Sequence, residues 1–244
     1  AQDSTFYGID LYGERKLAEL MDRLSDVEGL DWIRLHYAYP SKFPFDVLPI
    51  INSKPNICKY LDIPIQHISD NVLKSMRRGI TKRRTEEVLD RIRSEVDNIA
   101  LRTTLLVGHP GEYDQDFEEL KDFVNRYQFN RLGVFTYSHE DGTHAGTLED
   151  HVSQEIKSAR ADEIMGIQHD ISFAHNQKLI GSTQKVIIDR IEGDSYIGRT
   201  QFDSPEVDNE VIISLNEGYL RVGDFTNATI TGAESFDLIA KLNK

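Results

Sequence analysis

Apolar residues along the chain recur first at the spacing of a helix and then at the spacing of a strand. Leu17, Leu20, Met21 and Leu24 fall on one face of a helix. Residues 32–39, which follow, alternate polar and apolar side chains as a half-buried strand does. The chain is therefore expected to begin with a helix and then a strand.

The same order of helix and strand continues through the first half of the chain. The expected elements are a helix at 45–51, a strand at 60–65, helices that begin at Ser69, Thr81 and Asp114, and strands at 101–107 and 132–137. The run at 101–107 is almost continuously apolar or β-branched, which is typical of a strand covered on both faces. Four strands separated by helices predict a parallel α/β unit, half or more of a barrel, with its functional loops at the carboxyl ends of the strands.

Beyond Glu149 the pattern changes to one long helix and then to short β-rich runs. The helix is expected at about 153–179 and has an apolar stripe that we expect to be buried: Ile156, Ala159, Ile164, Ile167, Ile171 and Ala174. From Thr183 onward, β-rich runs alternate with Gly or Asn turns and predict a small antiparallel barrel of five strands. The expected segments are residues 1–150, a linking helix at 151–182, and a barrel at 183–244.

Composition indicates a globular chain without a membrane segment. The 244 residues are 39% apolar and 28% charged, and no run reaches the roughly 20 apolar residues that span a bilayer. We therefore expect a cytoplasmic protein. The formal charge of −13 disfavours the binding of nucleic acid over most of the surface. One basic cluster departs from this trend and is either a solvated surface or a face for an anionic cofactor or partner; it consists of Lys74, Arg77, Arg78, Lys82, Arg83 and Arg84.

Glycines follow one of the expected strands and mark a candidate binding loop. Residues 104–107 end in a loop that contains Gly108 and Gly111, and two glycines let a backbone approach a ligand closely. A tight turn with a helix-start carboxylate at Glu112 explains the same residues equally well. Glycine placement alone leaves both interpretations open.

Two other strand ends carry polar groups. Residues 61–65 lead into Gln66 and His67, an amide and an imidazole that are able to bind ribose or carboxylate groups. Phe135, Tyr137 and Ser138 precede an Asp-Gly turn at the end of another strand. A structural histidine and an ordinary loop are the alternatives. The eight histidines of the chain lack the spacing of a metal site, so we expect no metal ligands among them.

The order of these segments resembles the radical S-adenosylmethionine methylthiotransferases of the RimO type over nearly the whole chain. The segments that match the family's strand ends are residues 1–8, 63–67 with 73–79, 104–112, and 135–138 with 140–145; residues 198–208 match its TRAM barrel. The resemblance implies a partial radical-SAM (β/α)6 barrel followed by a small all-β, OB-like TRAM barrel. His109 and Tyr113 stand where the family usually has phenylalanine and threonine, so the fine contacts of that loop differ.

The resemblance also implies the cofactors and the residues that bind them. S-adenosylmethionine is expected at nine residues: Gln2, Asp3, Gln66, His67, Gly108, Gly111, Phe135, Tyr137 and Ser138. The family's 4Fe-4S cluster requires three cysteines, whereas Cys58 is the single cysteine of this chain. The chain starts at Ala1 without a methionine, and we expect it to be an excised piece. That piece would lack the N-terminal domain, the cluster cysteines and catalytic residues of its own, and would be inactive alone.

The resemblance implies a substrate as well, namely an aspartate of the twelfth small-subunit ribosomal protein. Residues 183–244 carry eleven acids against six bases, and this excess disfavours RNA and suits a basic protein. The expected contact edge consists of Asp203, Glu206, Asp208 and Glu210. A tRNA methylthiotransferase and a non-catalytic protein-binding or RNA-binding fragment remain the alternative functions.

Overall fold

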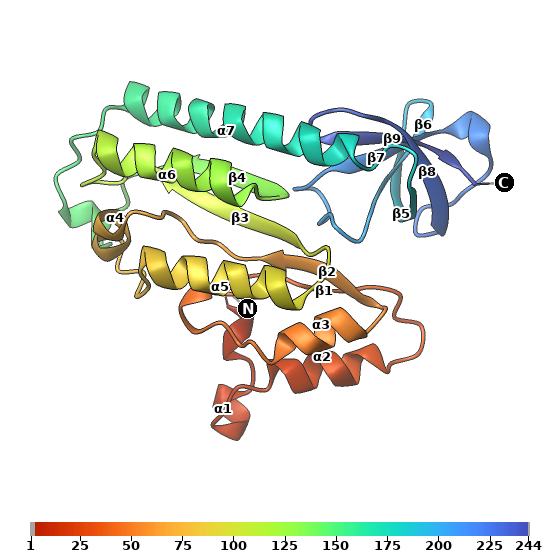
Figure 1. Ribbon diagram of the computed structural model, residues 1–244, viewed down its shortest axis with the longest axis horizontal. Helices are drawn as coiled ribbons and strands as arrows, with labels where there is room; N and C mark the ends of the chain where they lie inside the picture. The colour runs from red at the N-terminus through yellow and green to blue at the C-terminus, as the bar shows by residue number, and fades with distance from the viewer. Residues whose placement is uncertain (1–2, 244) are drawn as a thin grey trace. The chain divides into compact units, whose positions relative to one another are not determined.

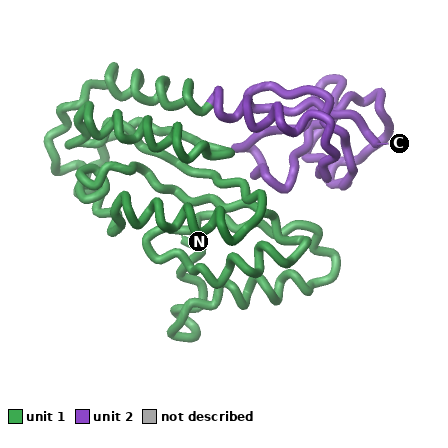
Figure 2. The backbone as a smooth tube through the Cα atoms, viewed as in Figure 1, with its two compact units in different colours: residues 1–168 green, residues 169–244 purple. Residues whose placement is uncertain are grey.

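A computed structural model describes residues 3–243 of the chain (Figure 1). The described residues fall into two compact units, and the boundary along the chain lies between Gln168 and His169 (Figure 2). None of the helices described combines the length and the apolar run needed to cross a membrane. The finer division expected at residues 150 and 182 stays a prediction.

The first unit is built on a parallel sheet of four strands in the order β1-β2-β3-β4, as the alternation of helices and strands predicted (Figure 1). The strands are β1 (Ile33–Leu35), β2 (Ile57–Asp62), β3 (Ala100–Val107) and β4 (Arg131–Thr136). The helices are α1 (Ile9–Tyr12), α2 (Leu17–Ser25), α3 (Val47–Ser53), α4 (Asp70–Ser75), α5 (Lys82–Glu95) and α6 (Asp114–Tyr127). Short 3-10 turns lie at Ser4–Phe6, Pro40–Lys42 and Ala145–Thr147.

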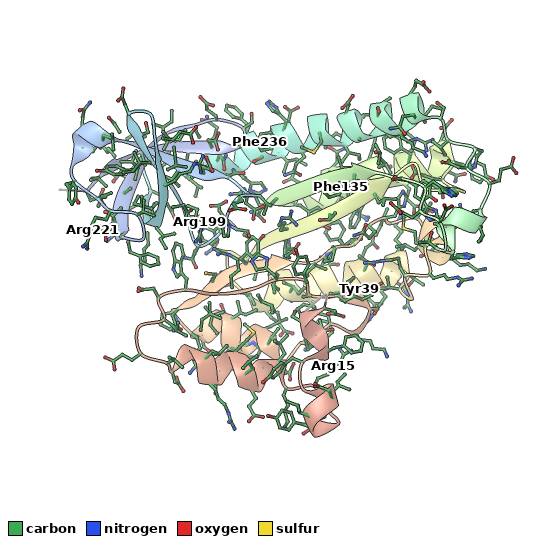
Figure 3. The ribbon with its side chains drawn as sticks, turned by 180° about the vertical axis from the view of Figure 1, so that it is seen from behind. Arg15, Tyr39, Phe135, Arg199, Arg221 and Phe236 are labelled. Carbon is green, nitrogen blue, oxygen red and sulfur yellow. The ribbon has the colours of Figure 1, made fainter. Side chains whose placement is uncertain are left out.

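Only one face of β3 is fully covered, so the expectation that both faces are buried is wrong. Leu101, Thr103, Leu105 and Val107 are buried, while the residues between them, Arg102, Thr104 and Leu106, are half-buried. Leu106 is in register with Phe135 of β4, which is 62% exposed (Figure 3). The half-buried face carries the Asp62–Arg102 ion pair, at 3.0 Å.

Helix starts follow the sequence signals in part. Thr81 caps α5 by accepting a hydrogen bond from an amide of its first turn. Ser69 precedes α4, but its hydroxyl donates to Asp116 instead of capping the helix. The expected cap at Asp114 is wrong, because Asp114 is the first residue of α6 and Tyr113 occupies the cap position. Asp116 accepts from the Tyr113 N–H instead, at 2.9 Å.

The long helix α7 (Gln154–Gln177) forms as predicted, but its buried stripe differs from the expected one. Ile164 and Ile171 are buried and Ile167 is half-buried, whereas Ile156, Ala159 and Ala174 are exposed. The buried residues of α7 include five polar ones: Lys157, Arg160, Gln168, Ser172 and Asn176. Three of them bond residues of the first unit: Lys157 bonds Asp150, Arg160 bonds Glu112, and Gln168 donates to the Phe129 carbonyl. These interactions, together with the burial of Ile164 and Ile171, determine which face of α7 is covered.

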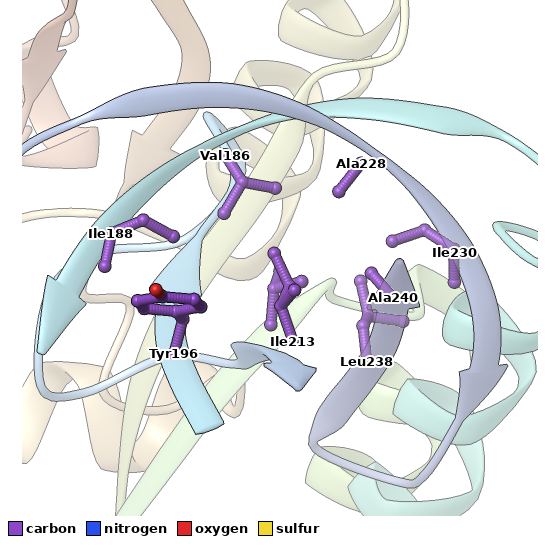
Figure 4. Close-up of a cluster of buried hydrophobic side chains, with 9 residues drawn as sticks. Val186, Ile188, Tyr196, Ile213, Ala228, Ile230, Leu238 and Ala240 are labelled. Carbon is purple, nitrogen blue, oxygen red and sulfur yellow. The ribbon is translucent and has the colours of Figure 1, made fainter. Parts of the chain in front are cut away.

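The second unit contains a closed barrel in the order β5-β6-β7-β9-β8, with strands β5 (Thr183–Glu192), β6 (Ser195–Arg199), β7 (Glu210–Ser214), β8 (Phe225–Ala233) and β9 (Asp237–Leu242). A 3-10 turn at Leu215–Glu217 follows β7. Four pairings are antiparallel, but β7 and β9 run parallel, so the expectation of a wholly antiparallel barrel is wrong. Apolar side chains such as Val186, Tyr196 and Ile213 fill the interior (Figure 4).

Candidate functional site

The carboxyl ends of three neighbouring strands bring together residues that the sequence singled out separately. Gln66 follows β2 and donates its backbone N–H to the Thr104 carbonyl of β3, at 2.9 Å. Tyr137 follows β4 and donates its N–H to the Val107 carbonyl, at 2.8 Å. Gly108 comes directly after β3, between these two contacts. The three strand ends therefore form one continuous edge, as in other parallel α/β folds.

Gln66 has an unusual backbone at this edge. Its φ is +73°, in the left-handed region that non-glycine residues rarely occupy. Such a conformation costs on the order of 1–3 kcal/mol and concentrates at functional sites. The half-buried side-chain amide makes no hydrogen bond within the described part of the chain. Its donors and acceptor are thus available to a ligand.

The loop after β3 requires its two glycines. Gly108 and Gly111 have φ values of +74° and +93°. A β-carbon at Gly108 would lie 2.3 Å from Cγ of Lys157, so a side chain fits neither the backbone nor the space. At Gly111 the nearest atom, the Ser75 hydroxyl oxygen, is 3.9 Å away, and only the φ angle demands glycine.

Glu112 holds this loop from inside. Its fully buried carboxylate accepts from the Gly108 N–H at 2.7 Å and from the His109 N–H at 3.3 Å. The other oxygen accepts from Arg160 of α7, at 2.8 Å. Burial raises the pKa of Glu112, and the Arg160 charge and the two amide donors oppose that rise. We assign the ionised form, since every one of these partners donates to the carboxylate.

His67 lies beside this carboxylate and is completely buried. Its Nδ1 accepts from the Ser69 N–H at 3.1 Å, which assigns the ring proton to Nε2. Nε2 is 3.8 Å from the Glu112 carboxylate and has no hydrogen-bond partner among residues 3–243. Burial lowers the pKa of His67 to about 3, so the imidazole is neutral at physiological pH.

Asp116 links the loop to the neighbouring helices. It accepts from the Ser69 hydroxyl, from the Asn71 amide at 3.0 Å and from the Tyr113 N–H at 2.9 Å. Burial alone would raise the pKa of Asp116, but these hydrogen bonds outweigh it and the pKa is lowered. Asn71 also donates to the Gly111 carbonyl at 2.9 Å. The glycine loop is therefore tied to both α4 and α6.

Tyr137 presents an unused hydroxyl at the same edge. Its ring packs edge-on to His109, with the centroids 5.5 Å apart, and Lys157 Nζ lies 4.9 Å from the ring centroid. The hydroxyl is buried without a hydrogen-bond partner in the described structure. A buried polar atom without a partner is costly unless a ligand or water satisfies it. Its place next to the glycine loop fits a polar ligand at this edge.

The other expected cofactor residues lie in different surroundings. Gln2 is outside the described residues. Asp3 lies beside the segment that follows β1. Its carboxylate accepts from the Thr5 N–H at 2.9 Å and from the Tyr39 N–H at 3.4 Å. Phe135 and Ser138 are exposed. The structure thus brings Gln66, His67, Gly108, Gly111 and Tyr137 to one edge of the sheet, and no hydrogen bond or ion pair within residues 3–243 joins Asp3 to them.

Sequence reasoning missed Arg160, Asp116 and Lys157, and it gave Glu112 only the role of a helix-start carboxylate. Glu112 directly follows a glycine loop, which is a usable signal. Arg160 comes 48 residues later in a helix whose apolar residues indicate a different face, and nothing local points to it.

On the barrel, the four expected contact acids differ in exposure. Asp203 is buried and accepts from the Thr200 hydroxyl at 2.5 Å, so it belongs to the interior of its turn. Asp208 accepts from the Ser204 N–H at 2.8 Å, and Glu210 forms a two-pronged ion pair with Arg190, at 2.5 and 3.0 Å. Glu206 is exposed, with a φ of +68°.

Comparison with known proteins agrees with this architecture. Residues 7–124 match the family model of the radical SAM superfamily, and residues 180–242 match that of the TRAM domain. Coproporphyrinogen III oxidase (HemN) from Escherichia coli, a radical SAM enzyme, has a similar fold, with a TM-score of 0.51 at 15% identity over 76% of this chain and 51% of that one. The two family matches, with a fold that agrees with them, define a radical SAM domain followed by a TRAM domain.

Three curated relatives share the sequence over its full extent. Those from Porphyromonas gingivalis, Cytophaga hutchinsonii and Bacteroides thetaiotaomicron are 55%, 54% and 54% identical to it and are each named ribosomal protein uS12 methylthiotransferase RimO. The matches cover 99%, 100% and 100% of this chain and 56% of each relative, so the chain spans about half their length. Over this shared part, the chain is similar to curated methylthiotransferases of the RimO type and carries the same two kinds of domain, radical SAM and TRAM.

Proposed function

We propose that this chain supplies the adenosyl pocket and the substrate-docking barrel of an enzyme that adds a methylthio group to an aspartate of ribosomal protein uS12. One observation carries the proposal: a glycine loop fixed by a buried carboxylate lies beside the unpartnered Tyr137 hydroxyl, at the carboxyl edge of a parallel sheet. The names of the relatives supply the substrate. Because the proposed substrate is a ribosomal protein, we expect the reaction to take place in the cytoplasm.

S-adenosylmethionine fits this edge. In our proposal Gly111, beside which a β-carbon would meet only the Ser75 hydroxyl, lets the backbone approach the adenosine, while Gln66 and Tyr137 offer hydrogen bonds to its polar groups. Gly108, which packs against Lys157, keeps the loop in its turn. His67 and Glu112 act behind the loop and hold it in shape. When bound, S-adenosylmethionine supplies the radical and the methyl group of the family's chemistry.

A four-iron cluster does not fit the residues of this chain. Cys58 is its single cysteine and is 1% exposed within β2, whereas such a cluster needs several thiolates. No group of three potential metal ligands occurs among the described residues. We propose that the cluster is held outside this sequence. Anaerobic reconstitution tests this, because stoichiometric iron and sulfide retained after gel filtration would contradict it.

Ligand titration tests the pocket. The chain is expected to bind S-adenosylmethionine weakly, since the cluster that anchors its amino and carboxylate groups is supplied elsewhere. Tyr137→Phe should weaken binding in isothermal titration, whereas Tyr12→Phe, which removes an exposed hydroxyl, should leave it unchanged. Spectroscopic placement of the adenine on the β5–β9 barrel would overturn the site.

The barrel is proposed to dock the ribosomal protein. Its excess of acids attracts a basic partner and steers the encounter. Because Asp203 is interior, the proposed contact edge consists of Glu206, Asp208 and Glu210. Charge reversal at Glu206 should weaken uS12 binding, and reversal at Glu217, an exposed acid on another loop, is the matched control. Tight binding of the barrel to tRNA at physiological salt, with uS12 ignored, would favour the tRNA methylthiotransferase instead.

A further inference from the structure

A basic surface lies next to the proposed adenosyl pocket and has no role in the function described so far. Residues 70–84 carry six basic side chains and one acid, although the chain as a whole has a formal charge of −13. Four of these cations are exposed, and we call them the basic patch: Lys74, Arg77, Arg83 and Arg84. Three of them line a surface pocket of about 630 Å³ between α4 and the start of α5.

Most of the charge in the basic patch is available to a partner. Within residues 3–243, no carboxylate is within ion-pair distance of Lys74 or Arg77. Arg83 and Arg84 share a single acid, Glu87, at 3.4 and 3.1 Å. The acid of the pocket, Asp70, accepts from the Lys82 backbone N–H at 2.6 Å. The exposed ion pairs of Arg83 and Arg84 with Glu87 are weak, so a phosphate is able to replace the carboxylate as their partner.

Arg77 occupies a backbone position that favours glycine. Its φ is +56°, and the Arg78 N–H bonds back to the Leu73 carbonyl at 3.0 Å, as at a helix end with a left-handed residue. A side chain in this conformation costs on the order of 1 kcal/mol relative to glycine. An arginine at a position where glycine would be more stable points to a use for its side chain.

The basic patch is attached to the glycine loop. Asn71 of α4 donates to the Gly111 carbonyl at 2.9 Å, and the Ser75 hydroxyl donates to the Pro110 carbonyl at 3.4 Å. Lys74 and Arg77 are therefore carried on the same turns of chain that support the proposed pocket. A partner bound there would lie beside the residue being modified.

We infer that the basic patch binds the phosphate backbone of RNA next to the modified aspartate. The inference rests on the proposed function, because a ribosomal protein presents its side chains among RNA phosphates. Three of the four cations are arginines, whose planar donors match phosphate oxygens. Large apolar side chains of residues 70–84 are not exposed, unlike those of a surface that inserts into a membrane. The patch contacts backbone and reads no base sequence.

Fluorescence anisotropy with a short labelled RNA hairpin, without uS12, tests the inference on the 244-residue chain. Affinity should fall as salt rises, and reversing three patch cations should weaken binding about tenfold or more and reduce the slope of log K against log salt by about 2–3. The patch variant carries Lys74→Glu, Arg77→Glu and Arg84→Glu. The control has the same net charge and reverses exposed cations elsewhere, namely Arg23→Glu, Lys178→Glu and Arg221→Glu. It should bind RNA almost as the unmodified chain does.

Arg77→Gly separates binding from folding. Glycine relieves the left-handed backbone, so thermal stability should be retained or rise, while RNA affinity falls and the salt slope decreases by about 1. Equal RNA binding by the patch and control variants, or unchanged affinity of Arg77→Gly, would overturn the inference. So would absence of RNA binding at low salt. If uS12 still binds the barrel in any of these cases, the proposed function stands; if RNA binds but uS12 does not, the proposed function fails instead.

Discussion

Replacing Glu112 with glutamine tests whether a buried charge pair fixes the glycine loop. The Glu112 side chain is fully buried and that of Arg160 is 7% exposed, with 2.8 Å between their charged atoms. Glutamine has nearly the same shape and still accepts from the Gly108 N–H. The substitution therefore removes the charge of residue 112 and leaves the guanidinium of Arg160 with less compensation.

The expected loss follows from this geometry. Removing one partner of a buried ion pair costs about 3–5 kcal/mol. Arg160 keeps a second contact, to Asp114 at 2.7 Å, but the Asp114 side chain is fully exposed and screened by water. We therefore expect the lower end, a loss of about 3 kcal/mol in the free energy of unfolding. For a unit of this size, that loss lowers Tm by about 6–12 °C.

Urea unfolding followed by tryptophan fluorescence measures this loss in the relevant unit. Trp32 is the only tryptophan of the sequence and belongs to the first unit. Glu112→Gln, Arg160→Met and the double variant form a double-mutant cycle. The double variant should lose less than the sum of the single variants, since no unpaired charge remains buried.

A loss below about 1 kcal/mol for Glu112→Gln would refute the assignment of an ionised carboxylate. If burial kept Glu112 protonated, glutamine would be close to an isostere of it and Arg160 would have no charged partner to lose. Strict additivity in the cycle would lead to the same conclusion, because it would show that the two side chains are energetically independent.

Three further tests, two of them with a matched control substitution, concern the packing of both units. The pKa of His67 is about 3 in the folded chain against 6.5 unfolded, so between these pH values the unfolded chain binds a proton that the folded chain does not. The free energy of unfolding therefore decreases as pH falls from 6.5 toward 3. His67→Gln should therefore flatten the fall of the urea midpoint between those pH values, and an unchanged profile would contradict the assignment. Gly108→Ala should lower Tm more than Gly13→Ala, because both have positive φ but only the first meets Lys157; equal losses would count against the close packing. In the barrel, Gly198→Ala places a β-carbon 2.4 Å from a backbone oxygen and should destabilise strongly, whereas Gly232→Ala meets only ordinary contacts and should be mild. If the two barrel variants melted at the same temperature, the close packing around Gly198 would be refuted.

The parallel sheet was predictable from the sequence because its signals are local. Runs such as residues 101–107 identify strands by hydrophobicity, and right-handed crossovers then fix their parallel order. The need for glycine at Gly108 and Gly111 was visible for the same reason, since both lie where a buried strand turns into a helix. Each of these features depends on a few adjacent residues.

Long-range polar pairing was not predictable in this way. Ile156 and Ala174 are apolar but exposed, while Arg160 on the same helix is buried, because it has a buried carboxylate to neutralise. Hydrophobic periodicity assigns the covered face of a helix on the assumption that apolar groups are the ones buried. The parallel pairing of β7 with β9 was not predicted for a related reason: the sequence of a short strand does not indicate in which direction it pairs with its neighbour.

The buried ion pair of the loop differs from most such pairs in one respect. An isolated buried pair is often replaced by apolar residues without loss. Here the Glu112 carboxylate also accepts from the Gly108 and His109 N–H groups, which are buried and turned inward by the left-handed backbone at Gly108. Leucine at both positions of the pair would leave these donors unsatisfied, at about 1–3 kcal/mol each. The conformation that only glycine permits thus requires the carboxylate, and the carboxylate requires Arg160.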